Sequence, residues 1–189
     1  MPTERLKNSI WVQNRSLMTE FNIRRATVED IPIIQSMADV VFRKTYANIL
    51  SPEQMEYMMG WMYSTSSLQS QIEGEGNAFY IAFLAEVPAA YVSFEQNGST
   101  YDGAKIFHLQ KLYVLPEYQH SGLGRQLFEF VKKFLSDHYS ERCRIELNVN
   151  RSNPAVGFYE HIGLVRTGQR DFPIGKGFYM NDFIYSLDI

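Results

Sequence analysis

The chain has 189 residues, of which 45% are hydrophobic, 21% charged and 14% aromatic. These proportions are those of a globular domain, and they exclude the disordered, collagen-like and coiled-coil classes. The formal net charge of −3 offers no basic surface to a phosphate backbone, so we expect no nucleic-acid partner.

The N-terminal residues and the single cysteine bear on domain organisation and compartment. Residues 1–20 show no hydrophobic periodicity, which predicts an N-terminal extension before one domain over residues 21–189. They also contain no apolar stretch of the kind found in secretory signals. Cys143 has no internal disulfide partner, as is typical of reducing compartments. We therefore expect a cytoplasmic protein with no membrane partner.

The first half of the domain predicts a strand, two helices and three strands. After a strand at 21–25, Thr27 and Asp30 form a capping-box pattern that starts a helix. The second helix begins at Ser51, with Pro52 in its first position and Gln54 closing a second box. Strands are predicted at 78–84, 88–95 and 105–115, with a turn at Asn97-Gly98 between the last two.

The second half continues with a glycine-containing loop and a strongly amphipathic helix at 122–137. A strand at 144–149 follows, and then a helix with Asn153 as N-cap that ends at Gly163. Two strands, 164–171 and 178–187, complete the chain. The order β-α-α-β-β-β-α-β-α-β-β predicts an α+β fold, an α/β sandwich with a mixed sheet covered by helices.

The loop before the long helix is a candidate anion site. Backbone N–H groups at a helix start attract phosphate, and glycines let it approach the main chain. The dinucleotide motif requires three glycines, but only Gly122 and Gly124 are present here. The nucleotide-triphosphate loop requires Gly-Lys-Ser/Thr, whereas Arg125 follows Gly124. On spacing alone, a simple tight turn explains the two glycines equally well.

Two motifs together resemble a known family. The pattern Gln119-x-x-Gly122-x-Gly124, directly after a strand reading Leu-Tyr-Val-Leu-Pro, resembles the acyl-CoA-binding motif of the GNAT superfamily of N-acetyltransferases. Residues 146–164, ELNVNRSNPAVGFYEHIGL, are similar to its second motif, with Leu164 in place of the usual phenylalanine. The resemblance covers about residues 20 to 189. It implies a mixed, mostly antiparallel sheet with a central splayed strand pair and helices on both faces.

The resemblance also implies acetyl-CoA as cofactor. Its pyrophosphate would lie on the amides of residues 119–125, its pantetheine arm would pair with the preceding strand, and Asn153 would reach that arm besides capping its helix. The implied cofactor-binding residues are Leu112, Tyr113, Val114, Gln119, His120, Ser121, Gly122, Leu123, Gly124, Arg125 and Asn153.

Two residues are candidates for catalysis. Tyr159 matches the family tyrosine whose hydroxyl assists the leaving thiolate; without the motif it would be an ordinary core tyrosine. His108 stands where some members place a glutamate base, and it could take the amine proton directly or through water. The alternative is a strand histidine that only forms hydrogen bonds. The missing glutamate leaves this assignment open.

The predicted activity is acetyl transfer from acetyl-CoA to a primary amine by direct attack in a ternary complex. The histidines show no metal-ligand spacing, so no metal is expected. Residues 45–64 and the ending DFPIGKGFYMNDFIYSL resemble bacterial enzymes that acetylate spermidine and spermine, which implies a polyamine or another small amine as acceptor. A protein or peptide N-terminus and a non-catalytic CoA-binding sensor remain alternatives. Dimers are common in the family, so a homodimer is one implied assembly.

Overall fold

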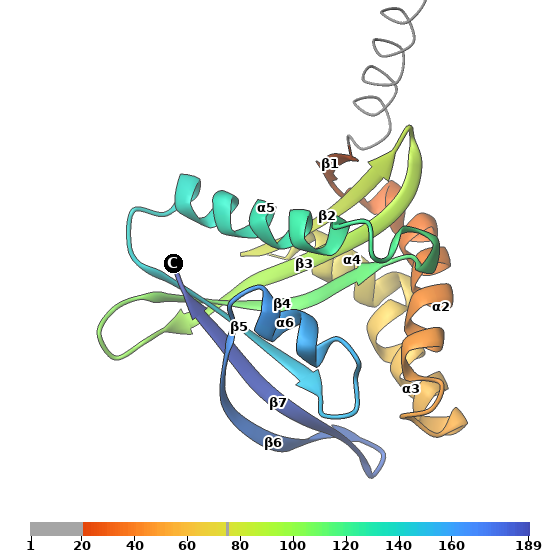
Figure 1. Ribbon diagram of the computed structural model, residues 1–189. Coiled ribbons are helices and arrows are strands. Elements are labelled where there is room, and N and C mark those ends of the chain that lie inside the picture. Colours follow the sequence, from red (N-terminus) through yellow and green to blue (C-terminus); the bar gives the residue numbers. More distant parts are fainter. Residues whose placement is uncertain (1–20, 75) are drawn as a thin grey trace, which may run out of the picture.

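A computed structural model describes residues 21–74 and 76–189 (Figure 1). The predicted extension, residues 1–20, lies outside the described residues. In chain order the elements are β1 (Phe21–Arg25), the 3-10 helix η1 (Val28–Asp30), α2 (Ile31–Tyr46), α3 (Pro52–Tyr63), α4 (Thr65–Glu73), β2 (Asn77–Leu84), β3 (Val87–Ser99), β4 (Lys105–Val114), the 3-10 helix η2 (Pro116–Tyr118), α5 (Leu123–His138), β5 (Cys143–Asn150), α6 (Val156–His161), β6 (Val165–Gly175) and β7 (Phe178–Asp188).

The strands form one seven-stranded sheet in the order β1-β2-β3-β4-β5-β7-β6. Every neighbouring pair is antiparallel except β4 and β5, which are parallel and are joined through the crossover helix α5. The β4–β5 pairing extends only from Lys105 with Cys143 to His108 with Glu146. Beyond these residues the two strands separate (Figure 1). The predicted mixed, mostly antiparallel sheet with a central splayed pair is confirmed.

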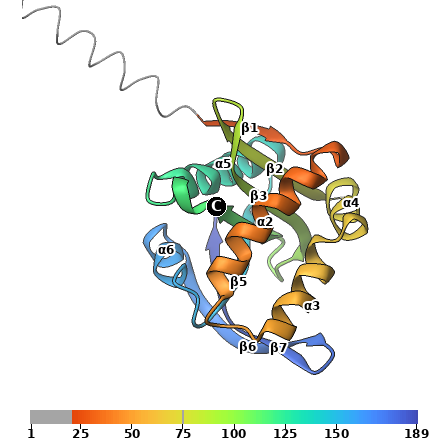
Figure 2. The same cartoon turned by 90° about the vertical axis from the view of Figure 1, so that its right-hand side faces the viewer.

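The helices cover both faces of the sheet, as predicted (Figures 1 and 2). On one face, α2, α3 and α4 pack against the N-terminal strands around Phe42, Phe79 and Tyr91. On the other face, α5 and α6 pack around a second core that includes Leu127 and Leu147. Because the central strands are buried on both faces, alternate residues of one strand belong to different cores. A residue's position in a strand therefore decides which functional surface it reaches.

Two predicted helix starts are present, with one difference. The Asp30 carboxylate accepts a hydrogen bond from the Thr27 backbone N–H at 2.9 Å, which closes the first capping box. At α3 the Ser51 hydroxyl accepts from the Gln54 N–H at 3.1 Å. The Gln54 side chain does not close the second box, because its amide donates to the Tyr179 carbonyl of β7 at 2.9 Å. A tertiary contact has replaced the local one.

The structure differs from the prediction in three places. Helix α4 was not predicted, although Ser64 caps it by accepting from the Ser67 N–H. The Asn97-Gly98 turn is instead an irregularity within β3, and the chain turns at residues 100–104. Helix α6 begins at Val156 rather than after Asn153, because the Asn153 side chain accepts from the Ala155 N–H and forms a turn before the helix.

Candidate active site

The divergence of β4 and β5 opens a cleft of about 970 Å³, bounded also by α2, α6 and the loop before α5. Residues 109–114 of β4 form part of its wall. Because β5 pairs with β4 only as far as His108, the backbone groups of this segment that face β5 have no strand partner. An extended, amide-bearing ligand can bind such an edge as an added strand.

The loop before α5 shapes the other end of the cleft. His120 has φ 61° and Gly122, the N-cap residue, has φ 86°. Left-handed residues in a tight loop gather neighbouring N–H groups into an anion-binding concavity, and the N-terminus of α5 adds its partial positive charge. Open space surrounds the Gly122 Cα, since a Cβ built there would meet no atom within 4 Å. This end of the cleft therefore fits a pyrophosphate.

Most of the predicted cofactor-binding residues line the cleft, and two do not. Ser121 lies outside the lining, and its hydroxyl donates to the Tyr118 carbonyl. Leu123 is 1% exposed and belongs to the core under α5, and its backbone N–H donates to the Ser121 hydroxyl at 3.4 Å. The predicted residues in the lining are Leu112, Tyr113, Val114, Gln119, His120, Gly122, Gly124, Arg125 and Asn153.

Two polar side chains of this group are already engaged by the protein. The Gln119 amide donates to the Val114 carbonyl at 3.0 Å, which ties the loop to the end of β4. The Asn153 amide donates to the Tyr46 hydroxyl at 3.3 Å, while its oxygen accepts from the Ala155 N–H. Asn153 therefore connects the turn before α6 to α2 at the cleft wall.

Tyr159 lines the cleft from α6 and is 9% exposed. Burial raises the pKa of its hydroxyl above the usual range, and the hydroxyl of Tyr46 acts in the same direction. The group therefore stays protonated at neutral pH and can donate a hydrogen bond or a proton. A leaving thiolate in the cleft is the kind of anion that such a donor stabilises.

His108 lies on β4, one residue before the segment that lines the cleft. Its neighbours Phe107 and Leu109 belong to the core under α5, so its ring faces the opposite side of the sheet. Its cross-strand partners are Glu95 on β3 and Glu146 on β5. Burial lowers the pKa of His108, while the charge of Glu95 acts against that effect. The imidazole is thus biased towards its neutral, proton-accepting form.

Sequence reasoning missed Lys111, which lines the cleft and is 8% exposed. Its position depends on a bulge, because Ser93 pairs with Lys111 while Phe94 pairs with Leu109, which leaves Gln110 as the extra residue of β4. The only sequence signal is a lysine within a strand that mixes polar and apolar residues, and lysines are usually at the surface. The bulge itself has no distinct residue pattern here.

Among the described residues, we looked for a cysteine nucleophile, a metal site and a membrane-spanning helix. Burial raises the pKa of the Cys143 thiol, which is the opposite of what an activated nucleophile requires. Within residues 21–74 and 76–189, no group of three acidic, histidine or cysteine side chains is arranged to hold a metal ion. In the same part of the chain, no helix combines the length and apolarity needed to cross a membrane.

Comparison with known proteins agrees with this geometry. The profile of the family described as "Acetyltransferase (GNAT) domain" matches residues 46–175. An uncharacterized N-acetyltransferase from Lactobacillus delbrueckii is 25% identical over 161 residues, covering 84% of this chain and 92% of that protein. The spermidine N(1)-acetyltransferase of Thermoplasma acidophilum is 29% identical over 137 residues, covering 72% of this chain and 81% of that protein.

A solved structure extends the comparison to the fold. The PaiA N-acetyltransferase of Thermoplasma acidophilum, solved in complex with coenzyme A, superposes with a TM-score of 0.69 at 24% identity. It covers 90% of this chain and 100% of its own. The chain belongs to the GNAT acetyltransferase family, as the sequence motifs predicted. It is an acyl-CoA-dependent N-acetyltransferase, an enzyme class that transfers the acetyl group of acetyl-CoA to an amine.

Proposed function

We propose that this chain acetylates a primary amine of a small molecule by direct attack on acetyl-CoA in a ternary complex. The observation that carries the proposal is the cleft between β4 and β5, in which a protonated Tyr159 and an anion-binding helix start face the same space. Acetyl-CoA supplies an acetyl group activated as a thioester.

Different residues of the cleft would bind acetyl-CoA and transfer protons. The loop amides and Arg125 hold the pyrophosphate, and the free edge of β4 pairs with the pantetheine amides. The amine nitrogen forms a bond to the carbonyl carbon while the C–S bond breaks. Tyr159 donates to the departing sulfur, and the proton lost by the amine leaves through His108 or an ordered water. No covalent bond to the enzyme forms.

The acceptor class is the next question for the proposed reaction. A relative named as a spermidine acetyltransferase makes polyamines one group to test. A peptide N-terminus is another. An assay of thiol release with polyamines, amino acids, aminoglycosides and peptides separates these functions. Absence of amine-dependent release across the whole panel would contradict the proposal.

The role of Tyr159 is tested on the best acceptor found. Tyr159→Phe should lower kcat by roughly tenfold to a thousandfold, the effect of one lost transition-state hydrogen bond of about 1.4–4 kcal/mol, while CoA affinity changes little. Tyr80→Phe is a matched control, because Tyr80 is also 9% exposed but lies on β2 outside the cleft lining. An unchanged kcat in Tyr159→Phe would show that the Tyr159 hydroxyl has no catalytic role and that the residue only packs in the core.

A further inference from the structure

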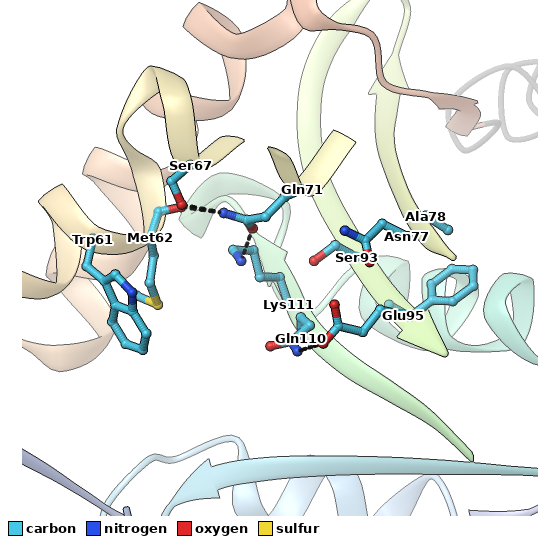
Figure 3. Close-up of a pocket in the computed structure, with 11 residues that line it drawn as sticks. Trp61, Met62, Ser67, Gln71, Asn77, Ala78, Ser93, Glu95, Gln110 and Lys111 are labelled. Atoms are coloured by element: carbon cyan, nitrogen blue, oxygen red, sulfur yellow. Dashed lines mark hydrogen bonds between the residues drawn. The ribbon is translucent and has the colours of Figure 1, made fainter. Parts of the chain in front are cut away.

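A second, smaller pocket of about 230 Å³ adjoins the cleft on the face covered by α3 and α4 (Figure 3). Gln110 and Lys111 line both spaces, so the two hollows border the same stretch of β4 at the bulge. The remaining polar lining includes Gln71 from α4 and Ser93 and Glu95 from β3. The pocket thus lies beside the segment of β4 that borders the acetyl-transfer cleft.

Lys111 brings a buried positive charge into this pocket. Its ammonium donates to the Gln71 side-chain oxygen (Figure 3). The ammonium also lies 5.6 Å from the centre of the Tyr63 ring. It forms no ion pair with any described residue, and an ammonium has three protons to donate. Burial lowers the pKa of Lys111 to about 8, because burial disfavours the charged form, while the charge of Glu95 acts against that effect. A bound anion would offset the cost of burial.

Ser93 places a second donor next to Lys111. The two residues are cross-strand partners, so their side chains lie side by side on one face of the sheet. Ser93 is 6% exposed, and its hydroxyl has no hydrogen-bond partner. Buried hydroxyls are normally satisfied, so an unpartnered one that lines a pocket points to a missing ligand. Together the two groups match the oxygen atoms of a carboxylate.

Glu95 adds a negative charge at the same pocket. Its carboxylate accepts a hydrogen bond from the Gln110 amide at 2.6 Å and is drawn facing the pocket in Figure 3. The lining thus offers one cation and one anion within a space that holds only a few small groups. A ligand that carries both charges at one end satisfies both side chains. A purely cationic chain would bring a like charge towards Lys111.

We propose that this pocket binds the zwitterionic head of an amino-acid acceptor, with the carboxylate at Lys111 and Ser93 and the α-ammonium at Glu95. The side-chain amine of that acceptor extends past Gln110 into the cleft, where it is acetylated. This inference rests on the proposed function and narrows its acceptor to amino acids with a side-chain amine. Lys111 is then the residue that selects against simple diamines and polyamines.

The test uses acceptor pairs that differ only by the carboxylate: L-lysine against 1,5-diaminopentane, and L-ornithine against 1,4-diaminobutane. In the unmodified enzyme, kcat/KM should be at least tenfold higher for the amino acid of each pair. Lys111→Met, which removes the charge and keeps an unbranched side chain one atom shorter, should reduce that ratio at least tenfold. Lys132→Met on α5, a lysine that pairs with Glu129 and lies outside both pockets, should leave the ratio unchanged.

Calorimetry on the CoA-loaded protein tests the pocket without turnover. L-lysine should bind at least tenfold more tightly than 1,5-diaminopentane, and Lys111→Met should remove the difference. Equal or reversed preference in the unmodified protein, or a preference that survives in Lys111→Met, would overturn the inference. Failure of acetyl transfer to every amine would instead count against the proposed function, because the binding comparison still reports on the pocket.

Discussion

Proton transfer depends on how single side chains are buried. Tyr159 and His108 are both shifted by burial towards their neutral forms, but with opposite consequences. A neutral phenol is a donor, whereas a neutral imidazole with a free ring nitrogen is an acceptor. The same physical cause thus prepares one residue to give a proton and the other to take one. The two residues belong to different elements, α6 and β4, and so depend on the fold to act together.

The role of His108 as base has a pH signature. Since burial lowers its pKa, the proton-accepting form should prevail above an apparent pKa below the usual 6.5 for histidine. We therefore expect kcat/KM to rise with pH through this lower pKa, and to rise again as the substrate amine, with a pKa near ~10, loses its proton.

His108→Ala should slow turnover and remove the lower limb, whereas His108→Gln should keep activity if the residue only orders a water. The measurement is the pH profile of each variant on the best acceptor. Superimposable profiles for His108→Ala and the unmodified enzyme would exclude His108 from the mechanism and leave a water chain as the proton's exit.

Of the helices and strands, α5 is the element whose first residues we expect to bind the cofactor. Gly122 has a positive φ and open space around its Cα, so a side chain there would project into that space. Gly122→Val should weaken CoA binding at least tenfold, because a branched side chain would occupy the room required by the pyrophosphate and strain the loop. Titration calorimetry with CoA measures the change.

The control for this variant separates backbone strain from loss of the site. Gly98 in β3 also has a positive φ, 81°, and a Cβ built there meets no atom within 4 Å. Gly98→Val therefore imposes a similar conformational cost away from the cleft, and CoA affinity should stay unchanged. Unchanged CoA affinity in a folded Gly122→Val protein would refute the assignment of the loop.

For the molecule as a whole, the cleft divides the sheet where it is least connected. Strands β4 and β5 share four registered pairs, while β3 and β4 or β5 and β7 share more. A ligand that lies between β4 and β5 contacts both parts of the sheet. At a hundredfold excess over Kd it should stabilise the folded state by about 2.7 kcal/mol, because it binds only the folded protein.

This stabilisation should raise Tm by roughly 5–10 °C for a chain of this size. Hydrogen exchange should also slow in residues 119–125. Differential scanning calorimetry with and without CoA gives the shift, and the Gly122→Val protein should lose most of it. A Tm that does not respond to saturating CoA would show that the cleft is not the cofactor site.

The local features of this protein could be read from its sequence. Thr27 with Asp30, and Ser51 with the Gln54 N–H, act within one helical turn, so neighbouring residues suffice to define them. The same holds for the glycine loop and for Tyr159, whose motifs are contiguous. The splayed strand pair was predicted only through the family resemblance that these motifs show. The extra helix α4 was missed because its nine residues include only two apolar side chains, Leu68 and Ile72.

The second pocket was decided only by the tertiary structure. In the sequence, nothing distinguishes Ser93, Glu95 and Lys111 from other strand residues. The bulge at Gln110 sets the register between β3 and β4 that brings them together. Because strand side chains alternate between faces, a shift of one residue moves Lys111 to the opposite core. Gln71 then reaches Lys111 from a helix forty positions earlier in the chain. Contacts of this kind depend on packing between distant segments, which no local pattern of residues encodes.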